Sequence, residues 1–250
     1  MRMKIALVVN PVGPDRKSNL AGIIGLIEKA GEHRAQLVLF PEAALTSLVN
    51  DDDPEHDLPL GETTHGPAIR ELCKLSRREL IWLGIGFLER ARNRLYDSAV
   101  LINPCGKIAL KYRRVSPGWH GNDADPLFYR QGRDVPVAET PFGRTGFLIC
   151  GDLFDDGIVV KLREKRPRVV LFPFARSFED GRWDLKRWEK EEKRAYAERA
   201  KQLGATILMV NYLSSIDGSF GGAMVVSPEG EITHQLPPGV SGILIGEVDL

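Results

Sequence analysis

Reactive side chains follow apolar segments in three separate parts of the chain. Cys150 comes directly after segment 144–149 and is followed by glycine, a pattern typical of a sharp turn that presents a thiol. Glu42 follows the apolar segment 37–40, and the basic cluster 111–114 ends a third such segment. Ligands in open α/β sheets bind outside the carboxyl ends of strands. We therefore expect an acid, a cation and a thiol to meet in one place.

These groups together have the chemistry of a thiol hydrolase. A thiolate is the reactive form, so Cys150 needs a neighbouring base or positive charge to ionise near neutral pH. Burial raises the pKa of a carboxyl, which would allow Glu42 to take that proton and later to activate water. A fixed cation would stabilise the oxyanion that forms when the thiolate attacks an amide or nitrile carbon. The expected intermediate is a thioester, and the reaction releases ammonia or an amine.

Composition limits the class of protein. With 250 residues, of which 43% are apolar and 27% charged, the chain resembles an ordinary globular domain, and we predict one domain spanning 1–250. The formal net charge is zero, so nothing indicates a nucleic-acid partner or an anionic membrane partner. No apolar run approaches the roughly 20 residues that cross a bilayer. The three scattered cysteines argue against a disulfide framework and favour a cytoplasmic location.

Strand and helix patterns alternate along the chain and predict an α/β fold with two sheets. Parallel units with helical connections are mixed with hairpins, which favours sheets that each carry helices on the outer face. The predicted strands are 5–9, 37–40, 81–88, 96–102, 108–112, 144–150, 169–172, 205–210, 223–226 and 243–248. The predicted helices are 20–30, one that starts at 66–67, 156–165 and 182–203. Residues 103–107 have the chemistry of a hairpin turn, while 50–61 and 116–136 are expected to be surface loops.

Several fragments resemble the signatures of a known family, in the family's order. They are segments 40–42, 111–114 and 146–152, supported by 221–230 and 247–250. Together they are similar to the nitrilase (carbon–nitrogen hydrolase) superfamily. The resemblance implies a four-layer α-β-β-α sandwich of two mixed sheets packed face to face, with the helices outside. It also implies cleavage of a non-peptide C–N bond in a small amide rather than a nitrile, without a metal or organic cofactor.

The chain departs from the family pattern after Cys150, where Gly151 replaces the usual aromatic residue and 153–156 replace the usual continuation, and at two positions expected in the site. The catalytic lysine of the family follows a Tyr-Arg pair, and that position holds Arg114 here. Lys111 is near in sequence, but strand alternation points it to the opposite face, so we expect Arg114 in the site. Its charge can bind an oxyanion, but its pKa above about 12 prevents proton transfer. Counting back from Gly132, the second, supporting glutamate of the family corresponds to Asp125.

The sequence also predicts residues of the substrate pocket and the partners of the protein. Trp119 and His120 in the long loop, with Arg176 after a strand end, are expected to line the pocket mouth. The partner is a small-molecule amide, and the protein is expected to be a homodimer. Because the chain ends at Leu250, directly after its last strand, helix surfaces would form the dimer interface. The histidines are dispersed, and the acidic segment 51–57 is interpreted as a solvated loop, so no metal site is predicted.

Two other functions fit the same residues. A hydrolase-like protein that binds a small molecule or partner without turnover would explain the two departures, with Arg114 as a structural ion-pair partner of Glu42. A hydrolase of another lineage would use His120 as the base. That alternative requires an imidazole nitrogen within roughly 3 Å of the Cys150 sulfur, or one bridging water.

Overall fold

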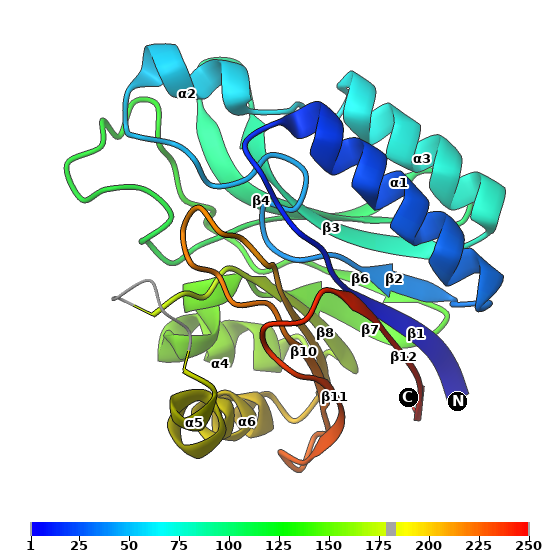
Figure 1. Ribbon diagram of the computed structural model, residues 1–250. Coiled ribbons are helices and arrows are strands. Elements are labelled where there is room, and N and C mark those ends of the chain that lie inside the picture. The colour runs from blue at the N-terminus through cyan, green and yellow to red at the C-terminus, as the bar shows by residue number, and fades with distance from the viewer. Residues whose placement is uncertain (1, 179–183, 250) are drawn as a thin grey trace.

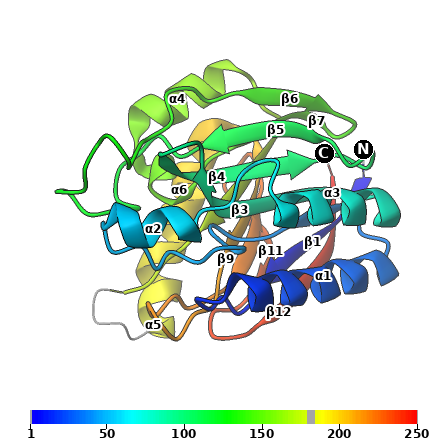
Figure 2. The ribbon, with the colours of Figure 1, turned by 90° about the horizontal axis from the view of Figure 1, so that it is seen from above.

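Two six-stranded sheets pack face to face, with helices on both outer faces (Figures 1 and 2). The structure is a computed structural model that describes residues 2–178 and 184–249. The four-layer α-β-β-α arrangement predicted from the sequence is confirmed. Within the described ranges, no helix combines the length and the apolar character needed to cross a membrane.

The first sheet has the strand order β12-β1-β2-β3-β4-β5. Its strands are β1 (Arg2–Val9), β2 (Leu37–Leu39), β3 (Trp82–Arg90), β4 (Leu95–Ile102), β5 (Ile108–Arg113) and β12 (Gly242–Asp249). Strands β1, β2 and β3 are parallel, whereas β4, β5 and β12 join by antiparallel pairing. Helices α1 (Arg16–Glu32) and α3 (Pro67–Glu79) cover its outer face through buried residues such as Ile23 and Leu72.

The second sheet repeats this plan with the order β11-β10-β9-β8-β7-β6. Its strands are β6 (Val137–Thr140), β7 (Gly143–Phe147), β8 (Val169–Phe174), β9 (Thr206–Asn211), β10 (Ala223–Val226) and β11 (Ile232–Leu236). The central strands β7, β8 and β9 are parallel. Helices α4 (Asp156–Glu164) and α6 (Lys193–Leu203) cover this sheet on its outer side (Figure 1).

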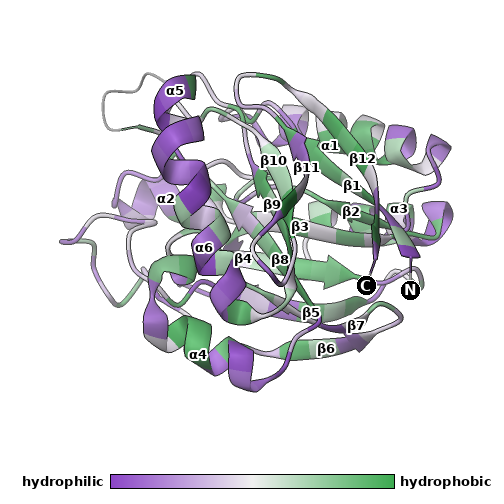
Figure 3. Cartoon of the chain, turned by 90° about the horizontal axis from the view of Figure 1, so that it is seen from below, coloured by the Kyte–Doolittle hydropathy of each residue, from purple (hydrophilic) through white to green (hydrophobic). Residues whose placement is uncertain are grey.

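The main core lies between the two sheets. Fully buried side chains of the first sheet, including Leu7 and Leu39, belong to the same cluster as Phe147, Leu171 and Leu208 of the second. Figure 3 shows apolar strands in the middle and hydrophilic surfaces on helices α5 (Leu185–Arg187) and α6. Apolar burial of this kind is the dominant favourable contribution to folding. It fixes the strands, and hence the strand ends that carry the site.

Two predicted elements differ from the structure. The segment 50–61 is not a plain loop, because helix α2 (Pro54–Leu60) begins there with Asp53 accepting a hydrogen bond from Glu55 N. The predicted helix 182–203 starts outside the described residues, and its described part is interrupted. Between α5 and α6 lies a π-helical turn, Trp188–Glu192. Such turns are often associated with functional sites, and this one ends at a residue of the cavity described below.

Candidate active site

Glu42 lies in a buried turn directly after β2. The turn is held against β3 by hydrogen bonds from Phe40 N to Gly84 O (2.9 Å) and from Gly86 N to Pro41 O (3.1 Å). A Cβ atom on Gly86 would lie 2.6 Å from the Cα of Glu42, so this close approach requires glycine. The Glu42 side chain is completely buried. The local packing therefore fixes the carboxyl group at the end of the strand.

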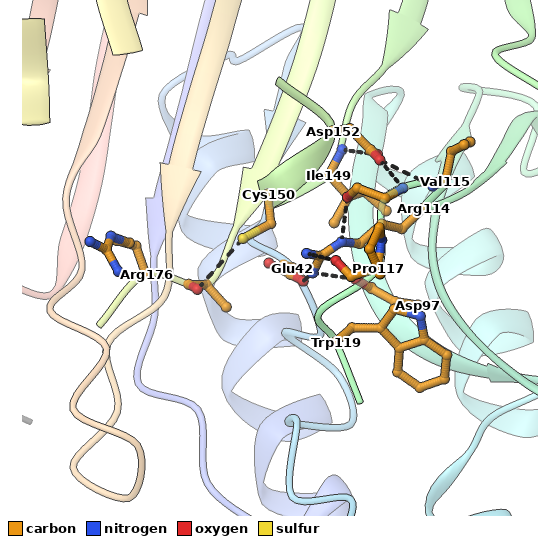
Figure 4. Close-up of polar contacts among 12 residues, drawn as sticks. Glu42, Asp97, Arg114, Val115, Pro117, Trp119, Ile149, Cys150, Asp152 and Arg176 are labelled. Atoms are coloured by element: carbon orange, nitrogen blue, oxygen red, sulfur yellow. Dashed lines mark hydrogen bonds and ion pairs between the residues drawn. The ribbon is translucent and has the colours of Figure 1, made fainter. Parts of the chain in front are cut away.

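Arg114 follows β5 and points into the same buried region. Its backbone N–H donates to Asp97 O at 2.8 Å, which continues the pairing of β5 with β4. Its Nη1 donates to Glu42 Oε1 at 3.0 Å, its Nε to Ser116 Oγ at 3.0 Å and its Nη2 to Pro117 O at 2.9 Å (Figure 4). All three nitrogens of the guanidinium group are thus held by the protein, and the residue is 5% exposed.

Strand alternation separates Arg114 from its basic neighbours. Lys111 and Arg113 lie on the other face of β5, where both pair with the buried Glu89. Their distances to the Glu89 carboxylate are 3.0 and 2.7 Å. The prediction that Lys111 points away from the site is confirmed.

Cys150 begins a 3-10 turn (Cys150–Phe154) two residues after β7. Its φ of 46° lies in the left-handed region, which is unfavourable for a residue with a side chain and is found at functional turns. The half-buried thiol lies 3.8 Å from Ala175 O. A Cβ on Gly151 would lie 2.9 Å from Arg114 Nη2, so the guanidinium packs against the backbone next to Cys150.

Asp152 links the turn at Cys150 to the segment after β5. Its buried carboxylate accepts hydrogen bonds from Tyr112 Oη (2.7 Å) and Ile149 N (2.9 Å) through one oxygen. The other oxygen accepts from Val115 N (3.1 Å) and Ser116 N (2.7 Å) (Figure 4). One carboxylate thus connects the two sheets at the level of the site. It sets the position of Arg114 relative to the thiol.

The electrostatics match the roles expected of an acid–thiol pair. Burial, followed by the charge of the Cys150 thiolate, raises the pKa of Glu42 to about 8, although Arg114 acts in the opposite direction. Burial acts to lower the pKa of Arg114, but the Glu42 carboxylate and the thiolate outweigh it and raise that pKa further. Arg114 is therefore a permanent cation, and Glu42 is a base that can exchange a proton near neutral pH.

Asp97 is a site residue that was not predicted from the sequence. It lies on β4 opposite Arg114, is buried, and places Oδ2 3.5 Å from Arg114 Nη1. Among the described residues, neither of its oxygens has a hydrogen-bond donor, and the same holds for Glu42 Oε2. Burial, followed by the charge of Glu42, raises the pKa of Asp97 well above its usual range. The available signal was an aspartate within the apolar segment 96–102, since strand interiors are depleted of aspartate.

Other residues predicted for the site lie elsewhere. Asp125 is exposed and accepts a hydrogen bond from Leu127 N at 2.8 Å, within its own loop turn. His120 places its ring nitrogens 2.8 Å from Gly121 O and 2.8 Å from Gln131 Nε2. These contacts, rather than one with Cys150, occupy the imidazole, and they disfavour a Cys–His hydrolase.

Trp119 is buried in a satellite cluster beside the site. Its indole is 6.0 Å from the Tyr129 ring, and its backbone oxygen accepts from Asn50 Nδ2 at 3.2 Å. Trp119 and His120 are not among the residues that line the cavity at Cys150. Arg176, the third predicted pocket residue, does line it.

A cavity of about 330 Å³ opens beside the thiol. Its walls are mainly apolar and aromatic, and it is lined by Cys150, Gly151, Phe154, Arg176, Glu192, Ala195 and Tyr196. Arg176 forms a bidentate pair with Glu192 at 2.7 and 3.0 Å and donates to Ser177 O at 2.6 Å. The charge of Arg176 is therefore already compensated. The cavity offers a neutral, largely apolar surface to the group bound next to Cys150.

The acidic segment near α2 does not form a convincing metal site. Asp51, His56 and Asp57 have ligand atoms within 4.8 Å of one another. Asp57 is buried, contrary to the predicted solvated loop, because its carboxylate accepts from Asp51 N (3.1 Å), Asp52 N (3.0 Å) and Tyr129 Oη (2.5 Å). Its oxygens thus already bind protein donors, and the cluster is explained by the folding of this segment.

The chain shares its sequence pattern and fold with known proteins. The family model described as Carbon-nitrogen hydrolase matches residues 4–250. The deaminated glutathione amidase of Dictyostelium discoideum is 24% identical over 94% of this chain and 84% of its own length. That of Mus musculus is 26% identical over 95% of this chain and 75% of its own. A solved amidase from Nesterenkonia sp. AN1, with acrylamide added at its active-site cysteine, has a TM-score of 0.81 at 22% identity, covering 99% of this chain and 93% of that one.

Proposed function

Because the chain belongs to the carbon–nitrogen hydrolase family, we propose that it hydrolyses the C–N bond of a small amide through a thioester on Cys150. The observation that carries this proposal is the convergence of three side chains from separate strand ends. Glu42 pairs with Arg114 at 3.0 Å, and the charge of the half-buried Cys150 thiolate acts to raise the pKa of both groups. An acid, a fixed cation and a thiol in one buried place are the groups that such a reaction requires.

The proposed reaction proceeds in two stages. Glu42 takes the proton of Cys150, and the thiolate attacks the amide carbon while Arg114 stabilises the oxyanion. The C–N bond then breaks, the leaving nitrogen takes the proton from Glu42, and an acyl thioester remains. In the second stage, Glu42 takes a proton from water, which attacks the thioester. The C–S bond then breaks, the sulfur takes that proton back from Glu42, and the carboxylic acid is released. Arg114 transfers no proton in either stage, since a guanidinium stays charged.

The cavity beside Cys150 supports a neutral acyl group as the preferred substrate portion. Phe154, Ala195 and Tyr196 provide an apolar surface, and Glu192 compensates the charge of Arg176. A substrate carboxylate would have to displace Glu192 from a bidentate pair, which costs affinity. Small aliphatic or aromatic amides fit this environment better than amides of dicarboxylic acids.

The test is ammonia release from a panel of neutral amides such as propionamide, butyramide and benzamide, together with intact-mass analysis of the enzyme. We expect an acyl adduct on Cys150 and no turnover by Cys150→Ala. Cys105→Ala is the matched control because that thiol is exposed and outside the site. Equal turnover by Cys150→Ala and the unaltered protein would refute the proposal.

One observation favours an alternative in which the protein binds small molecules without turnover. All three nitrogens of Arg114 are engaged by protein acceptors, as expected for a structural ion pair with Glu42. Under this alternative, no amide in the panel acylates Cys150, whereas Arg114→Lys, which restores the lysine of the family pattern, creates activity. Acylation of the unaltered protein would exclude it.

We also propose that the protein forms one domain over 1–250 and works in the cytoplasm as a homodimer. Its three cysteines, Cys73, Cys105 and Cys150, are free thiols, which supports a reducing compartment. The dimer rests on the family resemblance. Light scattering of the purified protein would measure its mass, and a monomeric mass would contradict the dimer.

A further inference from the structure

Two buried carboxyl groups of the site, Glu42 and Asp97, lie next to one guanidinium, that of Arg114. Arg114 Nη1 lies 3.0 Å from Glu42 Oε1 and 3.5 Å from Asp97 Oδ2. The charged or titratable groups that affect Asp97 are Glu42 after β2, Arg114 after β5, Tyr112 on β5 and Asp152 in the turn at Cys150. Within the described ranges, Arg114 is the one cation among them. If Glu42 and Asp97 were both ionised, these two carboxylates and Arg114 would together hold one uncompensated buried negative charge next to the carboxyl of Asp152, which is strongly unfavourable.

We propose that Asp97 keeps its proton and donates an O–H hydrogen bond to the Glu42 carboxylate, so that Asp97 is the positioning residue for the general base. Only the role of Glu42 as the general base depends on the proposed function. Glu42 Oε2 and both oxygens of Asp97 lie in the protein interior without a donor among the described residues. Two ionised carboxylates are acceptors only, and a single shared proton converts this unfavourable contact into a strong hydrogen bond.

The titration properties of the two acids agree with this arrangement. The pKa of Asp97 is raised by burial and by the charge of Glu42, and the proposed hydrogen bond to Glu42 acts in the same direction. The hydrogen bond from Asp97 acts in the opposite direction on Glu42 and favours its ionised form. With one proton on Asp97, the trio of Glu42, Arg114 and Asp97 is electrically neutral in a buried place.

The arrangement also accounts for arginine at position 114. The guanidinium spans both acids, because Nη1 faces Glu42 and Asp97 together while Nε and Nη2 are bound to Ser116 and Pro117. Neither Arg114 nor a neutral Asp97 exchanges a proton in the proposed reaction. Together they hold the Glu42 carboxylate in one orientation, with Glu42 itself carrying the protons that the reaction exchanges.

Infrared spectroscopy tests the protonation directly and does not require a known substrate. At about pH 9, one unit above the pKa of Glu42, we expect the carbonyl band of a buried protonated carboxyl in the unaltered protein and its loss in Asp97→Asn. The control Ser98→Ala changes the next residue of β4, which faces Glu89 on the other side of the sheet, and it should retain the band. Absence of the band from the unaltered protein would overturn the inference, whether or not an amide substrate has been found.

Kinetics on the best amide then distinguishes a neutral donor from a structural counter-ion. Asp97→Asn keeps the shape and an N–H donor, so we expect kcat within about threefold of the unaltered enzyme. Asp97→Ala removes the donor, and we expect kcat to fall about 10- to 100-fold with little change in KM. The acidic limb of its kcat/KM profile should move to higher pH, since Glu42 loses the bond that favours its ionised form. If Asn and Ala gave the same loss and the same profile, Asp97 would be an ionised partner of Arg114, and the inference would be wrong.

Discussion

Replacing Asp152 by asparagine tests how the two halves of the site are held together. The carboxylate accepts four hydrogen bonds, two on each oxygen, from Tyr112 on β5, from Val115 and Ser116 after it, and from Ile149 before the turn at Cys150. Asparagine has almost the same shape, but an NH₂ group replaces one acceptor oxygen. Two of the four groups that donate to Asp152 would then face the NH₂ group of asparagine, which is itself a donor. The substitution therefore removes interactions without creating a cavity.

The expected loss of stability follows from this count. A hydrogen bond to a charged group contributes about 1.5–3 kcal/mol, so two lost bonds lower the free energy of unfolding by about 3–6 kcal/mol. In a chain of this size, each kcal/mol lowers Tm by about 2–4 °C, which gives a decrease of about 6–24 °C. Because Arg114 and Cys150 are placed by the same carboxylate, kcat should also fall about 100-fold.

Urea unfolding followed by circular dichroism measures the first quantity, and ammonia release from the best amide measures the second. The matched control is Asp155→Asn, which alters a helix cap with one hydrogen bond to Ile158 N at 3.0 Å. Its cost should be no more than about 1 kcal/mol, with kcat retained. A stability of Asp152→Asn within 1 kcal/mol of the unaltered protein would contradict the role assigned to these four bonds.

Three further predictions concern the base, the turn and the cavity. The kcat/KM should rise with pH and level off above about 8, because Glu42 must be ionised. The pKa of Glu42 in the folded protein lies above its ordinary value of 4.5. Its contribution to the free energy of unfolding is therefore present below pH 4.5 and lost as pH rises through 8. A pH-independent kcat/KM, or the same pH slope of stability in Glu42→Gln, would contradict this. Gly86→Ala should lower kcat at least about 100-fold, because its Cβ would lie 2.6 Å from the Glu42 backbone, whereas Gly25→Ala has no atom within 4 Å and should keep full activity. Glu192→Gln should free Arg176 and raise kcat/KM for amides that carry a carboxylate about tenfold relative to neutral amides, and an unchanged ratio would refute the reasoning.

The sequence predicted the fold class and the principal residues because their signals are local. Apolar segments that end in Glu42 or Cys150 show where strands stop, and the carboxyl ends of strands are where ligands bind. The alternation of β5 was sufficient to separate Lys111 from Arg114. Each of these inferences needs only a few neighbouring residues.

Residues in long loops were predicted less well. Asp125 was chosen by counting along an irregular segment, where sequence separation does not determine position, and it lies exposed in a turn. The buried Asp57 was missed because its donors include Tyr129, which is far away in sequence. The ion pair of Arg176 with Glu192 likewise joins a strand end to a π-helical turn.

The sequence by itself determined which strand ends carry the acid, the cation and the thiol. Only the tertiary structure decided that Asp97 joins them. Starting from the pair Ile102–Ile108, a regular hairpin would place Asp97 opposite Arg113, but the irregularity between Leu101 and Ile102 moves the register by one residue. The extra residue lies in β5, so it turns Leu110, Tyr112 and Arg114 to the face that Asp97 shares with Ala99 and Leu101, whereas Ile108 lies on the other face. Asp97 thereby pairs with Arg114 in the site. One inserted residue in a ladder reverses the face of every side chain beyond it, and the hairpin pattern of the sequence does not show that insertion.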